Sequence, residues 1–296
     1  MADDDDEQET THSEDIPPAV SVRNIMLTIA YDGTAYRGWQ VQPNGRTVQE
    51  CVESAVWRLT GERRRVFCAG RTDTGVHALG QVANFHTVSR IPIENVRLGL
   101  QSCLPEDIVI VSATEAARTF HATYSSVRKR YRYVIHDAGI CPPFLRNYVQ
   151  RSRYRLRADL MHEAAQHLMG THDFRCFETK YPNKSSSIRT IMDVSVRRQP
   201  CWDPWTASHA WKPGASEETQ QPESPFIVFE IMADGFLYNM VRAIVGTLTE
   251  VGRCKQPPAS MAEVMRSMDR KNAGMTAVPG GLYLVQVEYP EVLLRP

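Results

Sequence analysis

The chain has 296 residues, 42% of them hydrophobic, with 34 basic and 34 acidic side chains. This length and composition suit a globular protein with a sizeable core, in one domain or two. Its longest apolar runs, such as 226–232, fall far short of the roughly 18 residues that span a bilayer. The N-terminus is acidic, whereas a signal peptide begins with basic residues. These features argue against a membrane or secreted protein, so we expect a cytoplasmic one.

The charge is unevenly distributed. Residues 1–15 hold eight acidic side chains and no Lys or Arg, which leaves 34 basic against 26 acidic residues in the remainder. An excess of positive charge favours a polyanionic partner, because neutralised phosphates release counterions. Residues 1–20, acidic and poor in aromatic side chains, cannot bury enough apolar surface to fold. We predict that they form a disordered tail.

Residues 21–117 predict a first α+β domain with the element order βαββαβ. Ile25, Leu27 and Ile29 alternate as in a strand, and Thr47 with Glu50 forms a capping box before an apolar helical pattern. The expected elements are a strand at 25–31, a helix at 48–59, strands at 65–69 and 81–88, a helix opened by Pro92, and a strand at 108–113.

Residues 118–296 predict a second α+β domain with the same order. The expected elements are a strand at 129–136, a helix at 159–169 ended by Gly170, strands at 188–197 and 226–233, a helix at 240–251, a shorter helix capped by Ser260 and Glu263, and a strand at 282–289. Residues 199–225, rich in Pro, Ser, Glu, Gln and Trp, interrupt a hairpin and predict a surface insertion.

The duplicated order predicts an α+β fold of two tandem ferredoxin-like (RRM-like) units. We expect mainly antiparallel sheets that abut around a central cleft, with the helices on the outer face. Ligand sites are common in such clefts.

Metal and cofactor motifs are absent from the sequence. The seven cysteines are scattered without a Cys-x-x-Cys pair, so we expect free thiols. His162 and His167 are five residues apart, about 140° around a helix, and do not form the zinc motif that needs both on one face. There is no P-loop and no dinucleotide fingerprint. We therefore expect neither a metal nor a cofactor.

A polar loop with three glycines, 70–82, lies between two predicted strands and contains Asp73. An Asp near an arginine in a loop on a rigid scaffold can be an ionised, aimed catalytic group. It can equally be an ordinary turn-capping residue. The residues alone leave both interpretations open.

The segment Gly70-Arg71-Thr72-Asp73-x-Gly75-Val76-His77 resembles the signature loop of the TruA family of pseudouridine synthases. Further blocks follow in the order of that family between about residues 25 and 290. They are Tyr31-Asp32-Gly33, Gly38-Trp39-Gln40, Thr47-Val48-Gln49, Phe120-His121-Ala122, Arg130-Tyr131-Arg132-Tyr133, Asn239-Met240-Val241-Arg242 and Gly281-Leu282-Tyr283-Leu284-Val285. Thr74, where Ala is commoner, and Tyr238, before Asn239, depart from the usual pattern.

The resemblance implies a cofactor-free isomerase that converts uridine to pseudouridine in tRNA. The family's usual target is the anticodon stem-loop, at positions 38, 39 and 40. Its members work as homodimers in which one tRNA touches both subunits. These properties are the expected function and partners of the chain.

The resemblance also implies roles for five residues. Asp73 matches the indispensable catalytic carboxylate. Arg71, which we expect to form the ion pair with Asp73, matches a residue that helps displace the target base. Tyr131 would stack on the uracil and assist proton removal from C5, Leu282 would pack on the other side of the base, and Arg242 matches a position associated with the active site.

Three reaction routes are open for Asp73: attack on C1′, addition to C6 of the uracil, or removal of a proton from the 2′ carbon. A non-catalytic tRNA chaperone of the same fold is the alternative function. A glycoside or nucleoside hydrolase that uses Asp32 and Asp73 as a carboxylate pair is a second.

Two arginine patterns suggest RNA contacts. In 128–135 the period of two places Tyr131 and Tyr133 on one face and arginines on the other, where they can reach phosphates. The alternative is a half-buried strand with core tyrosines. In 151–157 every second residue is Arg, which predicts either a track for the RNA backbone or a solvated edge.

Overall fold

The computed structural model describes residues 21–179, 186–202 and 224–295. The strands are β1 Arg23–Tyr31, β2 Phe67–Cys68, β3 His77–Thr87, β4 Ile108–Ala116, β5 Arg128–His136, β6 Gln150–Arg151, β7 Gly170–Asp173, β8 Ile188–Gln199, β9 Phe226–Ala233 and β10 Leu282–Glu288. The α-helices are α1 Val48–Thr60, α2 Ile93–Cys103, α3 Ala158–Gln166, α4 Met240–Gly252 and α5 Ser260–Ser267. Short 3₁₀ helices are η1 Pro143–Leu145, η2 Arg175–Phe177, η5 Arg270–Asn272, η6 Pro279–Gly281 and η7 Glu291–Leu293. The predicted acidic tail and most of the predicted insertion, 203–223, lie outside the described residues.

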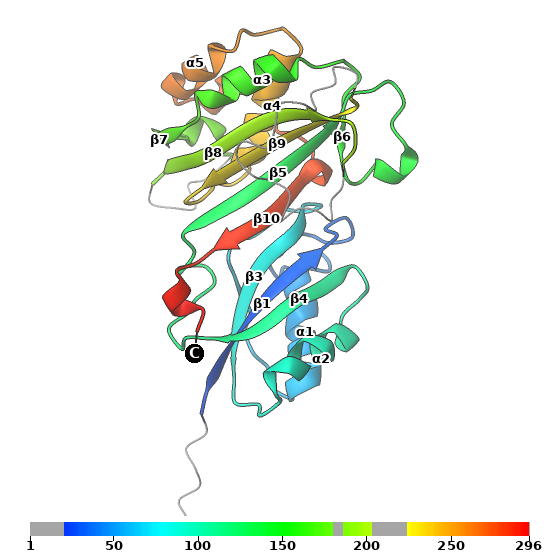
Figure 1. Ribbon diagram of the computed structural model, residues 1–296, viewed down its shortest axis with the longest axis vertical. Helices are drawn as coiled ribbons and strands as arrows, with labels where there is room; N and C mark the ends of the chain where they lie inside the picture. Colours follow the sequence, from blue (N-terminus) through cyan, green and yellow to red (C-terminus); the bar gives the residue numbers. More distant parts are fainter. Residues whose placement is uncertain (1–20, 180–185, 203–223, 296) are drawn as a thin grey trace, which may run out of the picture.

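The ten strands form one sheet with the path β4-β1-β3-β10-β5-β9-β8-β7, and β2 and β6 pair with β3 and β5. Pairing is antiparallel except between β10 and β3 and between β5 and β6. The prediction of two sheets that merely abut is wrong, because β10 lies between β3 and β5 and joins them (Figure 1). This pairing satisfies backbone groups that would otherwise be left at two sheet edges.

The strands of the two parts of the chain follow the same spatial order. Residues 21–117, which we call the first half, contribute β4-β1-β3 with β2 beside β3. Residues 118–296, the second half, contribute β10-β5-β9-β8, followed by β7. In each half the first strand of the chain thus lies between the last strand and the next-to-last one.

The helices gather in two groups, one in each half (Figure 1). In the first half α1 packs on α2, and α2 packs on β4; in the second, α3 contacts α4, α5 and β8. The predicted start of α1 is confirmed, because the Thr47 side chain accepts a hydrogen bond from the Glu50 amide at 3.4 Å. Gly61, with φ of 74°, ends that helix. The apolar faces of both groups contribute to one hydrophobic core.

Several element bounds differ from the sequence-based expectation. β2 is only two residues long, and β3 begins at His77 rather than at residue 81. Pairing with both β1 and β10 extends β3 through a Gly-containing stretch that lacks a strand pattern. α3 ends at Gln166, β6 and β7 were not expected, and Ser260 is the first residue of α5 rather than its cap.

All seven cysteines are free thiols, as expected. None of the helices within 21–179, 186–202 and 224–295 has the length and apolar character that crossing a membrane requires.

Candidate active site

Asp73 lies in the loop between β2 and β3, and backbone contacts hold this loop on two sides. The Trp39 amide donates to the Thr72 carbonyl at 3.0 Å. A Cβ on Gly38, whose φ is 84°, would approach that carbonyl oxygen to 2.5 Å, and one on Gly33 would lie 2.0 Å from the Val76 oxygen. Only glycine allows both approaches, so Gly33 and Gly38 hold the residues on either side of Asp73.

Arg242 forms the ion pair with Asp73. Its Nη1 lies 3.3 Å from Asp73 Oδ2. The guanidinium is itself held, because Nη1 donates to Asn239 Oδ1 at 2.8 Å and Nε donates to the Ala277 carbonyl at 2.7 Å. The Arg242 side chain is 16% exposed and that of Asp73 is 27% exposed. The arrangement therefore anchors one carboxylate oxygen and leaves the other available for chemistry.

The expectation that Arg71 pairs with Asp73 is wrong. Arg71 is exposed and makes no ion pair with the described residues, whereas its neighbour Thr72 is buried and shares a hydrogen bond of 2.7 Å with the Tyr31 hydroxyl. Burial of Thr72 turns the side chain of Arg71 toward solvent. Arg71 therefore faces solvent, and Arg242 takes the place beside Asp73.

Burial raises the pKa of the Asp73 carboxyl above its ordinary value, although the charge and hydrogen bond of Arg242 oppose the shift. A carboxylate with a raised pKa is a stronger base and a better nucleophile than one in water. Such perturbed groups are common in active sites. The loop interpretation in which Asp73 only caps a turn does not explain this environment.

Tyr131, in β5, faces the same core as the helices and is 8% exposed. Its hydroxyl would lie 3.8 Å from a Cβ at Gly70, and its ring meets Phe236 edge-on at 5.0 Å. Burial raises the pKa of the Tyr131 phenol far above its ordinary value, and the nearby charges of Tyr31 and Asp73 add to the shift. The phenol stays protonated at neutral pH and can donate a hydrogen bond.

Leu282 opens β10 and is 6% exposed. The next two residues of β10 pair with the first two of β3, Tyr283 with His77 and Leu284 with Ala78. Pro279, just before β10, lies 3.1 Å from the position of a Cβ on Gly75. The start of β10 therefore lies beside the loop that carries Asp73, and Leu282 belongs to this neighbourhood.

The sequence did not indicate which groups hold Arg242. Asn239 has φ of 61°, a left-handed conformation that is uncommon outside glycine, and it precedes the first turn of α4. Asn239 stands in the block Asn239-Met240-Val241-Arg242, but nothing in that block predicts the hydrogen bond that Arg242 donates to Asn239. The Ala277 carbonyl is a backbone group of a loop and has no sequence signature.

Most of the arginines expected to face RNA already have acidic partners. Arg130 contacts Asp193 at 2.8 Å and Arg132 contacts Glu230 at 2.6 Å, on the sheet face opposite Tyr131. The predicted alternation in β5 is confirmed, but these two arginines are engaged within the protein.

The second arginine run, 151–157, is partly engaged as well. Its four arginines are exposed, as the alternation predicts. Arg155 pairs with the buried Asp137 at 2.7 Å, and Arg157 pairs with Asp159 at 2.6 Å. A track of four free guanidinium groups is therefore not present.

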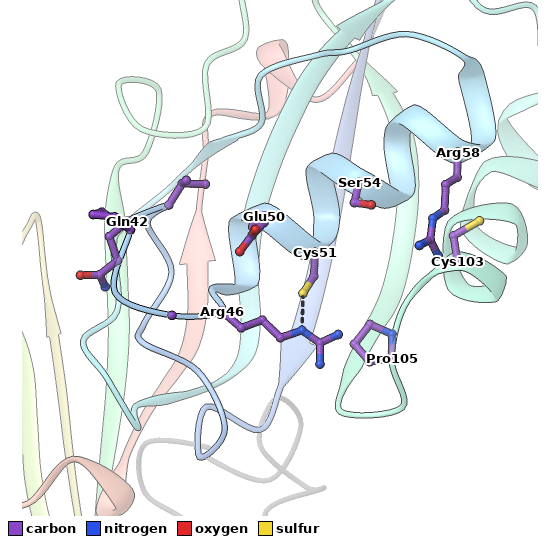
Figure 2. A pocket seen from close by; sticks show the side chains of 11 residues that line it. Gln42, Arg46, Glu50, Cys51, Ser54, Arg58, Cys103 and Pro105 are labelled. Atoms are coloured by element: carbon purple, nitrogen blue, oxygen red, sulfur yellow. Dashed lines mark hydrogen bonds between the residues drawn. The ribbon is translucent and has the colours of Figure 1, made fainter.

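A cavity of about 880 Å³ lies within the first half, on the exposed side of α1. Figure 2 shows Arg46, Cys51 and Arg58 on its wall, with Arg46 Nε 3.2 Å from Cys51 Sγ. None of the five predicted site residues lines it. It is therefore separate from the group of side chains around Asp73.

Within the described residues, no group of three or more His, Cys, Asp or Glu side chains is placed to hold a metal ion. The chemistry available around Asp73 is that of a carboxylate, a guanidinium and a phenol.

Comparisons with known proteins agree with the resemblance. The family model described as tRNA pseudouridine synthase matches residues 27–125 and 164–290. The chain is 43% identical over 268 residues to tRNA pseudouridine synthase A of Thermoanaerobacter sp. (strain X514). The aligned region covers 90% of this chain and 100% of that relative. The protein of the same name from Acetivibrio thermocellus gives the same identity and coverage. A solved structure titled "Crystal Structure of a Cbf5-Nop10-Gar1 Complex" matches at 10% identity and a TM-score of 0.31, over 88% of this chain and 57% of that one, which supports no conclusion.

Proposed function

This chain belongs to the TruA family of tRNA pseudouridine synthases, and from that premise we propose that Asp73 is the catalytic carboxylate of its uridine isomerisation. The observation that carries the proposal is the partly buried Asp73 with one oxygen anchored by Arg242 at 3.3 Å. The conversion of uridine to pseudouridine in tRNA, predicted from the sequence, is confirmed by the family membership.

The reaction needs no redox partner. The bond between N1 and C1′ of the uridine breaks, the uracil turns, and a bond between C5 and C1′ forms, while the C5 proton is lost and N1 gains one. A carboxylate can serve as nucleophile at C1′ or C6 or as base at the 2′ carbon. All three routes need Asp73 ionised, which the Arg242 guanidinium favours.

Four other residues receive proposed roles around the base. Tyr131 would stack on the uracil and take part in proton removal from C5, and Leu282 would pack on its opposite side. Arg71 would help to displace the base, which its exposure supports. Arg242 would hold the Asp73 side chain in position and stabilise its ionised form.

We propose positions 38, 39 and 40 of the anticodon arm as the target, in a cytoplasmic homodimer that works without metal or cofactor. The excess of basic residues outside the acidic N-terminus supports a polyanionic partner. The test is to map pseudouridines in total RNA with and without the protein. Pseudouridines that appear only elsewhere would overturn the choice of positions.

The two rival functions make different predictions. A chaperone of the same fold would bind tRNA and leave its uridines unchanged, whereas a hydrolase would release a free base. The hydrolase needs a second available carboxylate, but Asp32 already accepts hydrogen bonds from Tyr148 at 2.6 Å and from Thr34. An isomerase converts uridine to pseudouridine without changing the mass of the RNA. Conversion at constant RNA mass would therefore distinguish it from both rivals.

We further propose that residues 21–117 and 118–296 are two ferredoxin-like units. The shared strand order, with the first strand between the last and the next-to-last, supports this division. The loop between β2 and β3 that carries Asp73, which we call the catalytic loop, then belongs to the first unit. Arg242, Tyr131 and Leu282 belong to the second.

A further inference from the structure

Asp73 and its partners come from different halves of the chain, so catalysis depends on how the halves are placed at this point. Strand pairing between the halves is short there, with Tyr283 opposite His77 and Leu284 opposite Ala78. A misplacement of about 1 Å can cost roughly 100-fold in rate. Something beyond this pairing must hold the loop in register with the second half.

His77, the first residue of β3, directly follows the loop that carries Asp73 and is 2% exposed. Its Nδ1 accepts a hydrogen bond from the Gly33 amide at 3.1 Å, and Nε2 lies 3.0 Å from the Asn147 carbonyl, to which it can donate. The ring stacks on Tyr283 with centroids 4.9 Å apart and an angle of 21° between planes. One side chain thus touches the first half through Gly33 and the second through Asn147 and Tyr283.

Asp32 makes a second connection beside the first. Its Oδ1 lies 3.1 Å from His77 Nδ1, and its Oδ2 accepts from the Tyr148 hydroxyl at 2.6 Å. Burial raises the pKa of Asp32, but the hydrogen bonds that its carboxylate accepts, among them those from Thr34 and Tyr148, outweigh burial and lower it well below the ordinary range. Asp32 is therefore an acceptor for Tyr148 throughout the neutral range.

The segment that carries Asn147 and Tyr148 is itself anchored at the start of β10. The Tyr283 hydroxyl donates to the Tyr148 carbonyl at 2.6 Å. A Cβ on Gly280 would lie 2.5 Å from the Asn147 oxygen, so the two backbones are in direct contact. In Figure 1 β10 lies between β3 and β5, which places this anchor at the junction of the halves.

We propose that Asp32, His77 and Tyr148 form a positioning clamp, which fixes the catalytic loop of the first half against the second half so that Asp73 meets Arg242 and Tyr131. Within the part of the chain that the structure describes, none of the three side chains forms a hydrogen bond or ion pair with Asp73, so the clamp acts through the position of the loop. The inference rests on the proposed role of Asp73 and adds residues that act through it.

Tyr148→Phe tests the clamp with the least damage to folding, because it removes one hydroxyl and keeps the ring. We expect the single-turnover rate of pseudouridine formation to fall about tenfold, while the Kd for tRNA stays within twofold. The matched control is Tyr36→Phe. It removes the same kind of bond, from a tyrosine hydroxyl to the carboxylate of Asp107, but within the first half alone. Its rate should stay within twofold of the parent.

Asp32→Asn and the double variant complete the test. If both residues act through one clamp, the double variant is no more than about twofold slower than the slower single variant. Rate losses that multiply, or a Tyr148→Phe rate within twofold of the parent, overturn the clamp. An equal rate loss in Tyr36→Phe also overturns the clamp, because the loss in Tyr148→Phe would then reflect a general loss of packing rather than a lost contact between the halves. An Asp73→Asn variant as active as the parent overturns the proposed function instead.

Discussion

Replacing Arg242 with Gln should move the acid limb of the pH–rate profile to higher pH. The Arg242 guanidinium lies 3.3 Å from the Asp73 carboxylate, where two unit charges attract by about 5 kcal/mol at an effective dielectric constant of about 20. Both side chains are partly exposed, so solvent screening reduces this value. An opposite charge at such a distance typically lowers a carboxyl pKa by about 1–3 units.

The sign follows from the two opposing effects on Asp73. Burial raises the pKa of Asp73, and the charge and hydrogen bond of Arg242 limit that rise. Without the guanidinium the pKa rises further, and the reactive carboxylate is lost at a higher pH. We expect the midpoint of the acid limb to move up by about 1–3 pH units in Arg242→Gln. Arg242→Lys, which keeps a positive charge, should move it less.

The assay is the release of tritium from C5 of labelled uridine in tRNA, at single turnover and from pH 4.5 to 9. Arg270→Gln is the matched control. Arg270 also holds the segment that contains Ala277, through the Gly274 carbonyl and Thr276 at 2.9 Å each, but it does not influence Asp73. An unmoved midpoint in Arg242→Gln, or an equal shift in Arg270→Gln, would refute the electrostatic reasoning.

The remaining predictions concern stability, read as the melting temperature by calorimetry. Gly246→Ala should lower stability by about 1–3 kcal/mol, because the new Cβ would lie 1.7 Å from the Met275 carbonyl oxygen, which is backbone. Gly99→Ala meets only a flexible end of Leu59 at 2.6 Å, so helix propensity should keep it within about 1 kcal/mol of the parent; equal losses in the two variants would contradict this. Asp137→Ala leaves the buried Arg198 without its carboxylate and should cost about 3–5 kcal/mol, and a melting temperature within about 2 °C of the parent would contradict it.

Local signals in the sequence predicted most elements because the same local physics forms them. Thr47 caps α1 through the Glu50 amide, and the apolar spacing of α4 matches its buried face. The alternation in 128–135 placed the tyrosines and arginines of β5 on the correct faces. These patterns depend on neighbours within a few residues, which the sequence displays directly.

Long-range pairing explains what the sequence did not reveal. Arg242 is 169 positions from Asp73, and nothing local distinguishes it from an arginine at the edge of a core helix. Arg71, two residues from Asp73, was the nearer candidate, but the burial of Thr72 turns it away. The insertion of β10 beside β3 likewise depends on a contact between the halves, and it carries no pattern in either strand.

The most direct test of the account is the activity of Asp73→Asn on its tRNA substrate. The amide keeps the size and hydrogen-bonding shape of the side chain, so the variant should fold and bind tRNA with a Kd close to that of the parent. We expect no detectable conversion of uridine to pseudouridine under conditions in which the parent reacts to completion. Conversion by Asp73→Asn at the parental rate would contradict the assignment of Asp73 as the catalytic carboxylate.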